Sequence, residues 1–147
     1  MSTLAEILLT ETSRPVLISD CVNLVDDEVR SKSGVTGFAI KAAYKTVKAV
    51  KPGIIKDVVS VLVDDFVAQL ESAYQAFGES GGDDIRTYVQ QNAAEIADAL
   101  LVITDRRADK SRHRTLVKAY KKLRPKGKKH VIDAMPGIGK MLAKHGV

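Results

Sequence analysis

The chain has 147 residues, 45% of them hydrophobic and 28% charged, with a formal net charge of +5. This is the composition of an ordinary globular protein, and the length predicts a single domain over residues 1–147 that is able to bury a core. Every apolar run is too short to cross a bilayer, the N-terminus has no basic leader, and the one cysteine, Cys21, excludes an internal disulfide, so we expect a cytoplasmic protein without an integral membrane segment.

Charge alternates along the chain in blocks. Residues 1–31 carry six acids and two bases, and residues 57–105 carry ten acids and one base. Between and after them, residues 32–56 carry six lysines and no acid, and residues 110–147 carry twelve bases and one acid. Such blocks favour a polyanionic partner for the basic segments, or pairing of acidic helices with basic ones within or between chains.

Helical spacing of apolar residues recurs along the whole chain, and no stretch shows the two-residue alternation of a strand. The breaks at Pro, Gly, Asn and Asp predict an all-α fold, a compact bundle of about eight to nine helices. After Pro52-Gly53 we expect an apolar segment over 54–62 and a break at Asp64-Asp65, and the linker is 78–82. The expected helices cover residues 4–9, 13–31, 34–51, 65–77, 83–91, 93–108, 118–123, 129–135 and 138–145.

The helix expected after Gly34 carries two stripes. Thr36 or Gly37 can cap its start, and Pro52-Gly53 ends it. Apolar residues recur at helical spacing on one stripe, and lysines recur on a second stripe about 100° away from it. No acid interrupts these lysines. The members of the apolar stripe are Ile40, Ala43, Tyr44, Val47 and Val50, and those of the basic stripe are Lys41, Lys45, Lys48 and Lys51.

The two halves of the chain align with each other. Residues 18–33 align with 96–111 at an offset of 78, with Ile, two Asp, Lys and Ser in common, and an offset of 76 then places Ala-Tyr-Lys around Tyr44 on the same triplet around Tyr120. This predicts an internal duplication with pseudo-repeats at approximately 12–77 and 83–147, related by a rough twofold axis. The alternative is that helices rich in Ala, Lys and Val align by chance.

Three segments carry a resemblance to a known family. They are Lys-Ser-Gly at 32–34, Ala-Ile-Lys-x-x-Tyr-Lys-x-Val-Lys-x-x-Lys-Pro-Gly-Ile-Ile at 39–55, and Ala-Asp-Ala-Leu-Leu-x-x-Thr-Asp at 97–105. Together they resemble a family of short uncharacterised bacterial proteins, mostly actinobacterial, that is a domain of unknown function. The resemblance covers nearly the whole chain. It implies an all-helical cytoplasmic protein and carries over no catalytic residue.

One local motif is similar to the helix-hairpin-helix of non-specific DNA-binding proteins. In the segment 132–143, Pro136 is followed by Gly137, Ile138 and Gly139, and Lys140 comes next. In such a motif the backbone at Gly137 and Gly139 approaches a phosphate at a helix N-terminus, with Lys140 adding charge. The alternative is a simple Pro-Gly break between two packing helices, which is favoured by the truncated second helix.

The sequence offers no catalytic arrangement that we recognise. His113, His130 and His145 have no zinc spacing, the Asp pairs are explained by helix starts and solvated faces, and no nucleophile, base and orienting group come together. We therefore expect a protein that is not an enzyme and holds neither a cofactor nor a metal.

The best functional hypothesis is a non-enzymatic protein with a basic face for a polyanion, bound through its backbone without sequence preference. Nucleic acid is preferred to an anionic membrane because the sequence shows no strongly amphipathic helix with exposed bulky apolar residues. The alternatives are a solvated lysine surface without a ligand, and an interaction protein that forms homo-oligomers through complementary acidic and basic helices. The lysines proposed to contact the polyanion are Lys41, Lys45, Lys48, Lys118, Lys121, Lys122, Lys126, Lys128 and Lys129.

Overall fold

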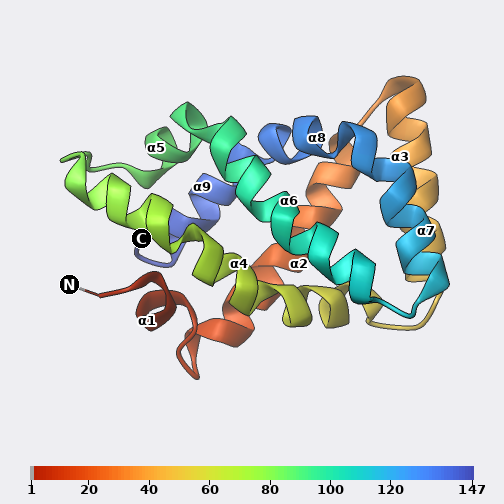
Figure 1. Ribbon diagram of the computed structural model, residues 1–147, viewed down its shortest axis with the longest axis horizontal. Coiled ribbons are helices and arrows are strands. Elements are labelled where there is room, and N and C mark those ends of the chain that lie inside the picture. The colour runs from red at the N-terminus through yellow and green to blue at the C-terminus, as the bar shows by residue number, and fades with distance from the viewer. Residues whose placement is uncertain (1) are drawn as a thin grey trace.

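The computed structural model describes residues 2–147, and across this range the chain is all-α, as the sequence predicts (Figure 1). No strand occurs in the described residues, and none of their helices is both long and apolar enough to cross a membrane. The α-helices are α1 (Leu4–Leu8), α2 (Ser13–Ser31), α3 (Gly34–Lys48), α4 (Ile54–Glu79), α5 (Ile85–Gln91), α6 (Ala93–Lys110), α7 (Arg114–Leu123), α8 (Gly127–Asp133) and α9 (Met135–Lys144), with a 3-10 turn η1 (Arg124–Lys126) between α7 and α8.

Local signals set several of the helix ends. The side chain of Thr3 caps α1 by accepting from the backbone N–H of Glu6 at 3.2 Å, and Asp84 caps α5 by accepting from Arg86 at 3.0 Å. Gly53 adopts a φ of +75° just before α4, a conformation that favours glycine, and so lets the chain turn sharply after α3. Pro52 and Gly53 therefore separate α3 from α4, as expected.

The break expected at Asp64-Asp65 is wrong, because α4 runs unbroken from Ile54 to Glu79. The two acids do not start a helix; each faces a guanidinium of a neighbouring helix. Asp64 pairs with Arg14 of α2 at 2.9 Å, and Asp65 pairs with Arg107 of α6 at 3.3 Å. α4 passes between these two basic side chains. Its buried apolar residues continue on either side of the acids, with Val63 before them and Val67 after them.

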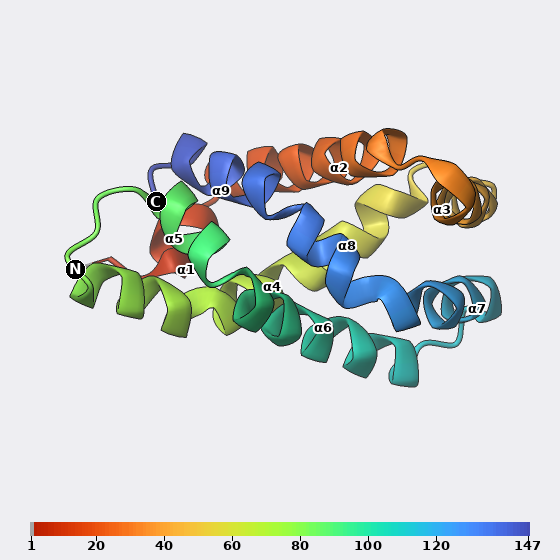
Figure 2. The ribbon, with the colours of Figure 1, turned by 90° about the horizontal axis from the view of Figure 1, so that it is seen from above.

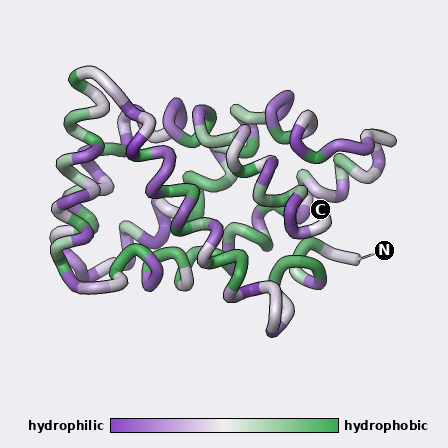
Figure 3. The backbone as a smooth tube through the Cα atoms, turned by 180° about the vertical axis from the view of Figure 1, so that it is seen from behind, coloured by the Kyte–Doolittle hydropathy of each residue, from purple (hydrophilic) through white to green (hydrophobic). Residues whose placement is uncertain are grey.

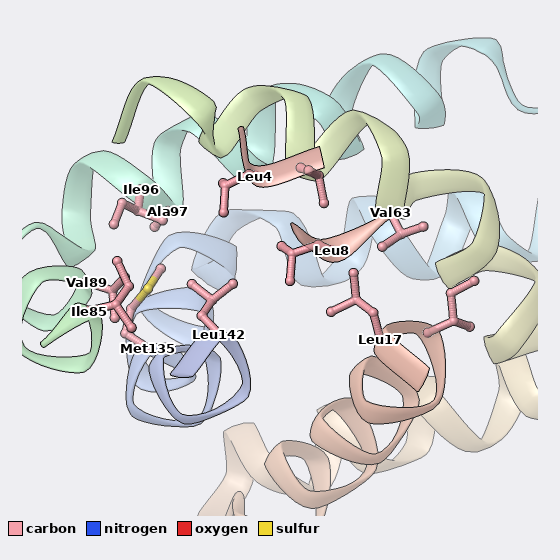
Figure 4. Close-up of a cluster of buried hydrophobic side chains, with 12 residues drawn as sticks. Leu4, Leu8, Leu17, Val63, Ile85, Val89, Ile96, Ala97, Met135 and Leu142 are labelled. Atoms are coloured by element: carbon pink, nitrogen blue, oxygen red, sulfur yellow. The ribbon is translucent and has the colours of Figure 1, made fainter. Parts of the chain in front are cut away.

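The long helices α2, α4 and α6 form the body of the molecule, with α8 and α9 packed along them (Figures 1 and 2). Apolar and polar stretches alternate along the tube of every long helix (Figure 3). The buried apolar side chains come from six helices and meet between them (Figure 4). They include Leu4, Leu8, Leu17, Val63, Ile85, Val89, Ile96, Ala97, Met135 and Leu142.

Contacts in the first half have counterparts in the second. α1 packs on α4 as α5 packs on α9, and α2 packs on α4 as α6 packs on α8. In the same way, α2 contacts α3 as α6 contacts α7, and α3 and α7 contact each other. A twofold axis between α3 and α7 would relate these pairs. The internal duplication itself stays a prediction, because similar packing alone does not establish a common origin.

Candidate functional site

The two lysine-rich helices lie side by side. α3 and α7 contact each other at the end of the molecule remote from both termini, and they run in opposite directions (Figures 1 and 2). Neither helix contains an acid. We call their exposed lysines the α3–α7 lysine set: Lys41, Lys45, Lys48, Lys118, Lys121 and Lys122.

The members of this set have no carboxylate partner in the part of the chain that the structure describes. Within the described residues, none of the six forms an ion pair. Lys48 alone has a marked contact, with its ammonium 5.3 Å from the centre of the Tyr44 ring. Lysines without local acids keep their full charge for a ligand, and lysine–lysine repulsion is relieved when an anion binds.

The other three predicted lysines have protein partners. Lys126 donates to the Thr36 hydroxyl at 3.2 Å. Lys128 pairs with Asp98 of α6 at 3.0 Å. Lys129 pairs with Asp133, one turn along α8, at 3.1 Å. Within the described residues, the structure thus divides the nine predicted lysines into six on α3 and α7 that form no ion pair, two that contact another helix and one, Lys129, that pairs within α8.

A tyrosine joins each lysine-rich helix to an acidic one. Tyr44 of α3 donates its hydroxyl to Asp26 of α2, and Tyr120 of α7 donates to Asp105 of α6. Burial and the neighbouring carboxylate raise the pKa of both tyrosines. Asp105 also accepts from Arg124 at 2.8 Å, and hydrogen bonds from Arg124 and Tyr120 lower the pKa of its carboxyl. These contacts fix how α3 and α7 lie on α2 and α6.

Two exposed apolar side chains accompany the lysines. Val35 is 90% exposed and Phe38 is 77% exposed, both near the start of α3. The sequence analysis expected no strongly amphipathic helix with exposed bulky apolar residues, and on α3 two such residues are exposed. Val35 and Phe38 precede the apolar stripe, which begins at Ile40, and they lie off it. The spacing of apolar residues therefore did not predict that these two side chains would be exposed.

The glycines of the hairpin-like motif face other helices. A Cβ on Gly137 would collide with the side chain of Leu24 on α2, and a Cβ on Gly139 would lie 3.0 Å from the backbone of Arg86 and 2.9 Å from Val89 on α5. Close packing of α9 on α2 and α5 accounts for both glycines without a phosphate. Lys140 is exposed. The phosphate-binding role of Gly137, Gly139 and Lys140 stays a prediction.

The histidines have separate surroundings. His145 at the end of α9 lies 2.7 Å from Asp20 of α2, and Lys144 pairs with the same carboxylate at 3.0 Å. His113 is exposed between α6 and α7. In the described part of the chain, no three His, Cys, Asp or Glu residues come together as metal ligands would. The histidines therefore do not mark a metal centre in these residues.

The chain belongs to a family of unknown function (DUF6918), whose model matches residues 4–146. No curated protein and no solved structure matches it. The resemblance seen in the sequence is confirmed at the level of this family.

Proposed function

We propose that this member of a family of unknown function is a non-enzymatic binding protein whose α3–α7 lysine set holds the backbone of a nucleic acid. The observation that carries the proposal is the juxtaposition of two acid-free helices whose six exposed lysines have no carboxylate partner among residues 2–147. The cytoplasm, where nucleic acids are accessible, is the compartment we propose for it.

Binding through lysines is expected to be weak and independent of sequence. Ammonium groups on flexible chains contact phosphates as point charges and do not read base edges. Each neutralised phosphate releases counterions, so six contacts would give a slope of about −5 in log affinity against log salt for duplex DNA. Phe38, exposed on the same helix, offers a ring on which an unpaired base can stack, which favours single strands over duplex.

A titration tests this proposal. Duplex DNA, single-stranded RNA and vesicles of anionic lipid are each titrated with the protein at two salt concentrations. We expect both nucleic acids to bind at low salt and to lose affinity steeply as salt rises. Binding to vesicles alone would contradict the proposal and assign Val35 and Phe38 to a membrane surface. Absence of binding to all three at low salt would leave the lysines as a solvated surface.

Self-association through acidic and basic helices is the weaker proposal. Three acids of α2 and α6 are already paired within the chain: Asp20 with Lys144, Asp98 with Lys128 and Asp105 with Arg124. These pairs reduce the negative charge that a second copy would meet. Light scattering at low and high salt separates the two proposals, since a mass that stays monomeric in both excludes charge-driven oligomers.

A further inference from the structure

An apolar pocket that is partly open to solvent lies between the helices, and we call it the chamber. It has a volume of about 430 Å³ and is lined by residues of every α-helix except α5. Leu8, Leu17 and Val63 of its wall point toward one another (Figure 4). Protein interiors are normally packed with few voids larger than a water molecule. An apolar cavity of about 150 Å³ is known to stay dry and to bind benzene, and ligand sites commonly measure about 300–1,000 Å³. The chamber has the size of a ligand site.

The chamber ends at a polar cleft of about 410 Å³ between the start of α3 and helix α8. Glu28, Lys32 and His130 line both spaces, so these three side chains form the boundary between them. A molecule that fills the chamber with an apolar chain would therefore have its other end beside polar groups. This is the arrangement expected of a site for an amphiphile.

The boundary has polar groups that the protein leaves unsatisfied. The Nδ1 atom of His130 is buried and has no hydrogen-bond partner. Glu28 forms no ion pair within the described residues. A buried nitrogen without a partner is unfavourable, so a small turn of the His130 ring that exposes Nδ1 to the chamber, together with a ligand that then bonds to it, is favoured. By contrast, the polar wall residues Tyr120 and Arg124 are already bonded to Asp105.

Charges at the boundary balance one another. Asp133 accepts from Lys32 and from Lys129, each at 3.1 Å, and the Glu28 carboxylate offsets the remaining positive charge. Burial, together with the charges of Lys32 and Lys129, lowers the pKa of His130, so its imidazole is neutral at neutral pH. A charged head group would meet a compensated set of charges and would lose its hydration without gaining a free counter-charge.

We propose that the chamber binds a small amphiphile whose apolar chain lies among the helices and whose uncharged head group hydrogen-bonds between His130 and Glu28. A hydroxyl has the chemistry for this position, because it can donate to the Glu28 carboxylate and, once the His130 ring has turned to expose Nδ1, exchange a second hydrogen bond with that nitrogen. The site is separate from the α3–α7 lysine set, so this proposal does not depend on nucleic-acid binding.

Displacement of a fluorescent probe tests it on the full chain. N-phenyl-1-naphthylamine, which is uncharged and fluoresces in apolar surroundings, is bound first and then displaced by 1-dodecanol, dodecanoate or dodecylammonium below their aggregation limits. We expect one probe per chain and the strongest displacement by 1-dodecanol. Failure of the probe to bind, failure of 1-dodecanol to displace it, or stronger displacement by either charged compound would overturn the proposal.

Two pairs of variants locate the site. V25F adds a ring to the chamber wall and should abolish probe binding, whereas V102F makes the same change on an exposed part of α6 outside the chamber and should not. H130F removes the unpartnered nitrogen and should weaken 1-dodecanol about threefold to tenfold, the value of one hydrogen bond, when the affinity of 1-dodecanol is compared with the probe affinity measured for the same variant. H130N should restore most of this loss. If V25F unfolds, the histidine pair decides alone. Equal 1-dodecanol affinity in the parent and H130F would contradict the assigned head-group position.

Discussion

Tyr120 of α7 donates its hydroxyl to Asp105 of α6, and these two residues secure the second lysine-rich helix to the body of the protein. Tyr44 and Asp26 make the same contact between α3 and α2. Each tyrosine lies between an apolar interior and a basic surface, so it is placed to orient lysines without contacting a ligand itself. The basic end of the molecule thus rests on two similar joints.

The first prediction concerns these joints. Y44F and Y120F keep the ring and remove only the hydroxyl, so each should lower the free energy of unfolding by about 1 kcal/mol, the usual value of one partly exposed hydrogen bond. Tyr120 also shares a hydrogen bond with Thr104 at 2.6 Å, so Y120F should cost somewhat more than Y44F. Chemical denaturation measures them, with T46V, which removes a hydroxyl bonded only within α3, as the control. A loss at one tyrosine and none at the other would contradict equivalent joints.

The second prediction concerns glycine. G139A forces a Cβ to within 3.0 Å of the α5 backbone and should destabilise the protein by about 1–3 kcal/mol. G137A meets the flexible end of Leu24 and should cost less. The control is G78A in α4, where a Cβ meets nothing, and where alanine should stabilise by about 0.5–1 kcal/mol.

The same variants separate packing from phosphate binding. If Gly137 and Gly139 serve only packing, G137A should bind nucleic acid as well as the parent chain does. A large loss of affinity in folded G137A would instead favour the hairpin-like phosphate site with Lys140. Affinity at low salt, compared with thermal unfolding of the same sample, provides the measurement.

A third prediction concerns the stability of the protein at low pH. Hydrogen bonds from Arg124 and Tyr120 lower the pKa of Asp105 in the folded state, so its stabilising effect is present above the unfolded pKa of about 3.9 and is lost as pH falls through the lower folded value. D105N should therefore be less stable than the parent by about 1 kcal/mol at pH 6, and this difference should vanish on acidification. D109N, on the same helix, removes a carboxylate without an ion pair in the described residues and should change little. A difference between D105N and the parent that is constant with pH would contradict the assignment.

A fourth prediction concerns the single thiol. Burial, assisted by the charge of Asp20, raises the pKa of Cys21 to about 11. Alkylation by iodoacetamide at pH 8 should therefore be about a hundredfold slower in the native protein than in denaturant, because the thiolate is the reactive form. Cys21 also lines the apolar chamber, so saturating 1-dodecanol should slow the reaction further. Equal rates with and without 1-dodecanol would show that the chain does not reach Cys21.

Much of the fold follows from the sequence because helical periodicity and breaker residues are local signals. They give the all-α class, most helix positions and the separation of α3 from α4 at Gly53. The continuity of α4 does not follow, since Asp64 and Asp65 suit a helix start equally well until Arg14 and Arg107 are seen beside them. Long-range ion pairs of this kind leave no local pattern.

The candidate sites were predictable in different degrees. The lysine stripes are visible in the sequence. The alignment of the two halves places Tyr44 on Tyr120, and in the structure each of these tyrosines donates to an aspartate. The partners are offset by one position in that alignment, so the duplication stays a prediction. The chamber was missed, because a void depends on how helices far apart in the chain approach one another. The sequence shows only His130 in a basic segment, and a single histidine there does not indicate a pocket.

The central claim is that the α3–α7 lysine set, and not net charge alone, binds the nucleic acid backbone. K118Q/K121Q/K122Q removes three positive charges from α7, and Q69E/Q90E/Q91E makes the same net change at exposed positions on α4 and α5. Affinity for single-stranded RNA is measured at low salt for both variants and the parent chain. We predict a loss of about tenfold or more, with a shallower salt dependence, in the lysine variant and little change in the glutamate variant. Equal losses in the two variants, or none in the lysine variant, would contradict the claim.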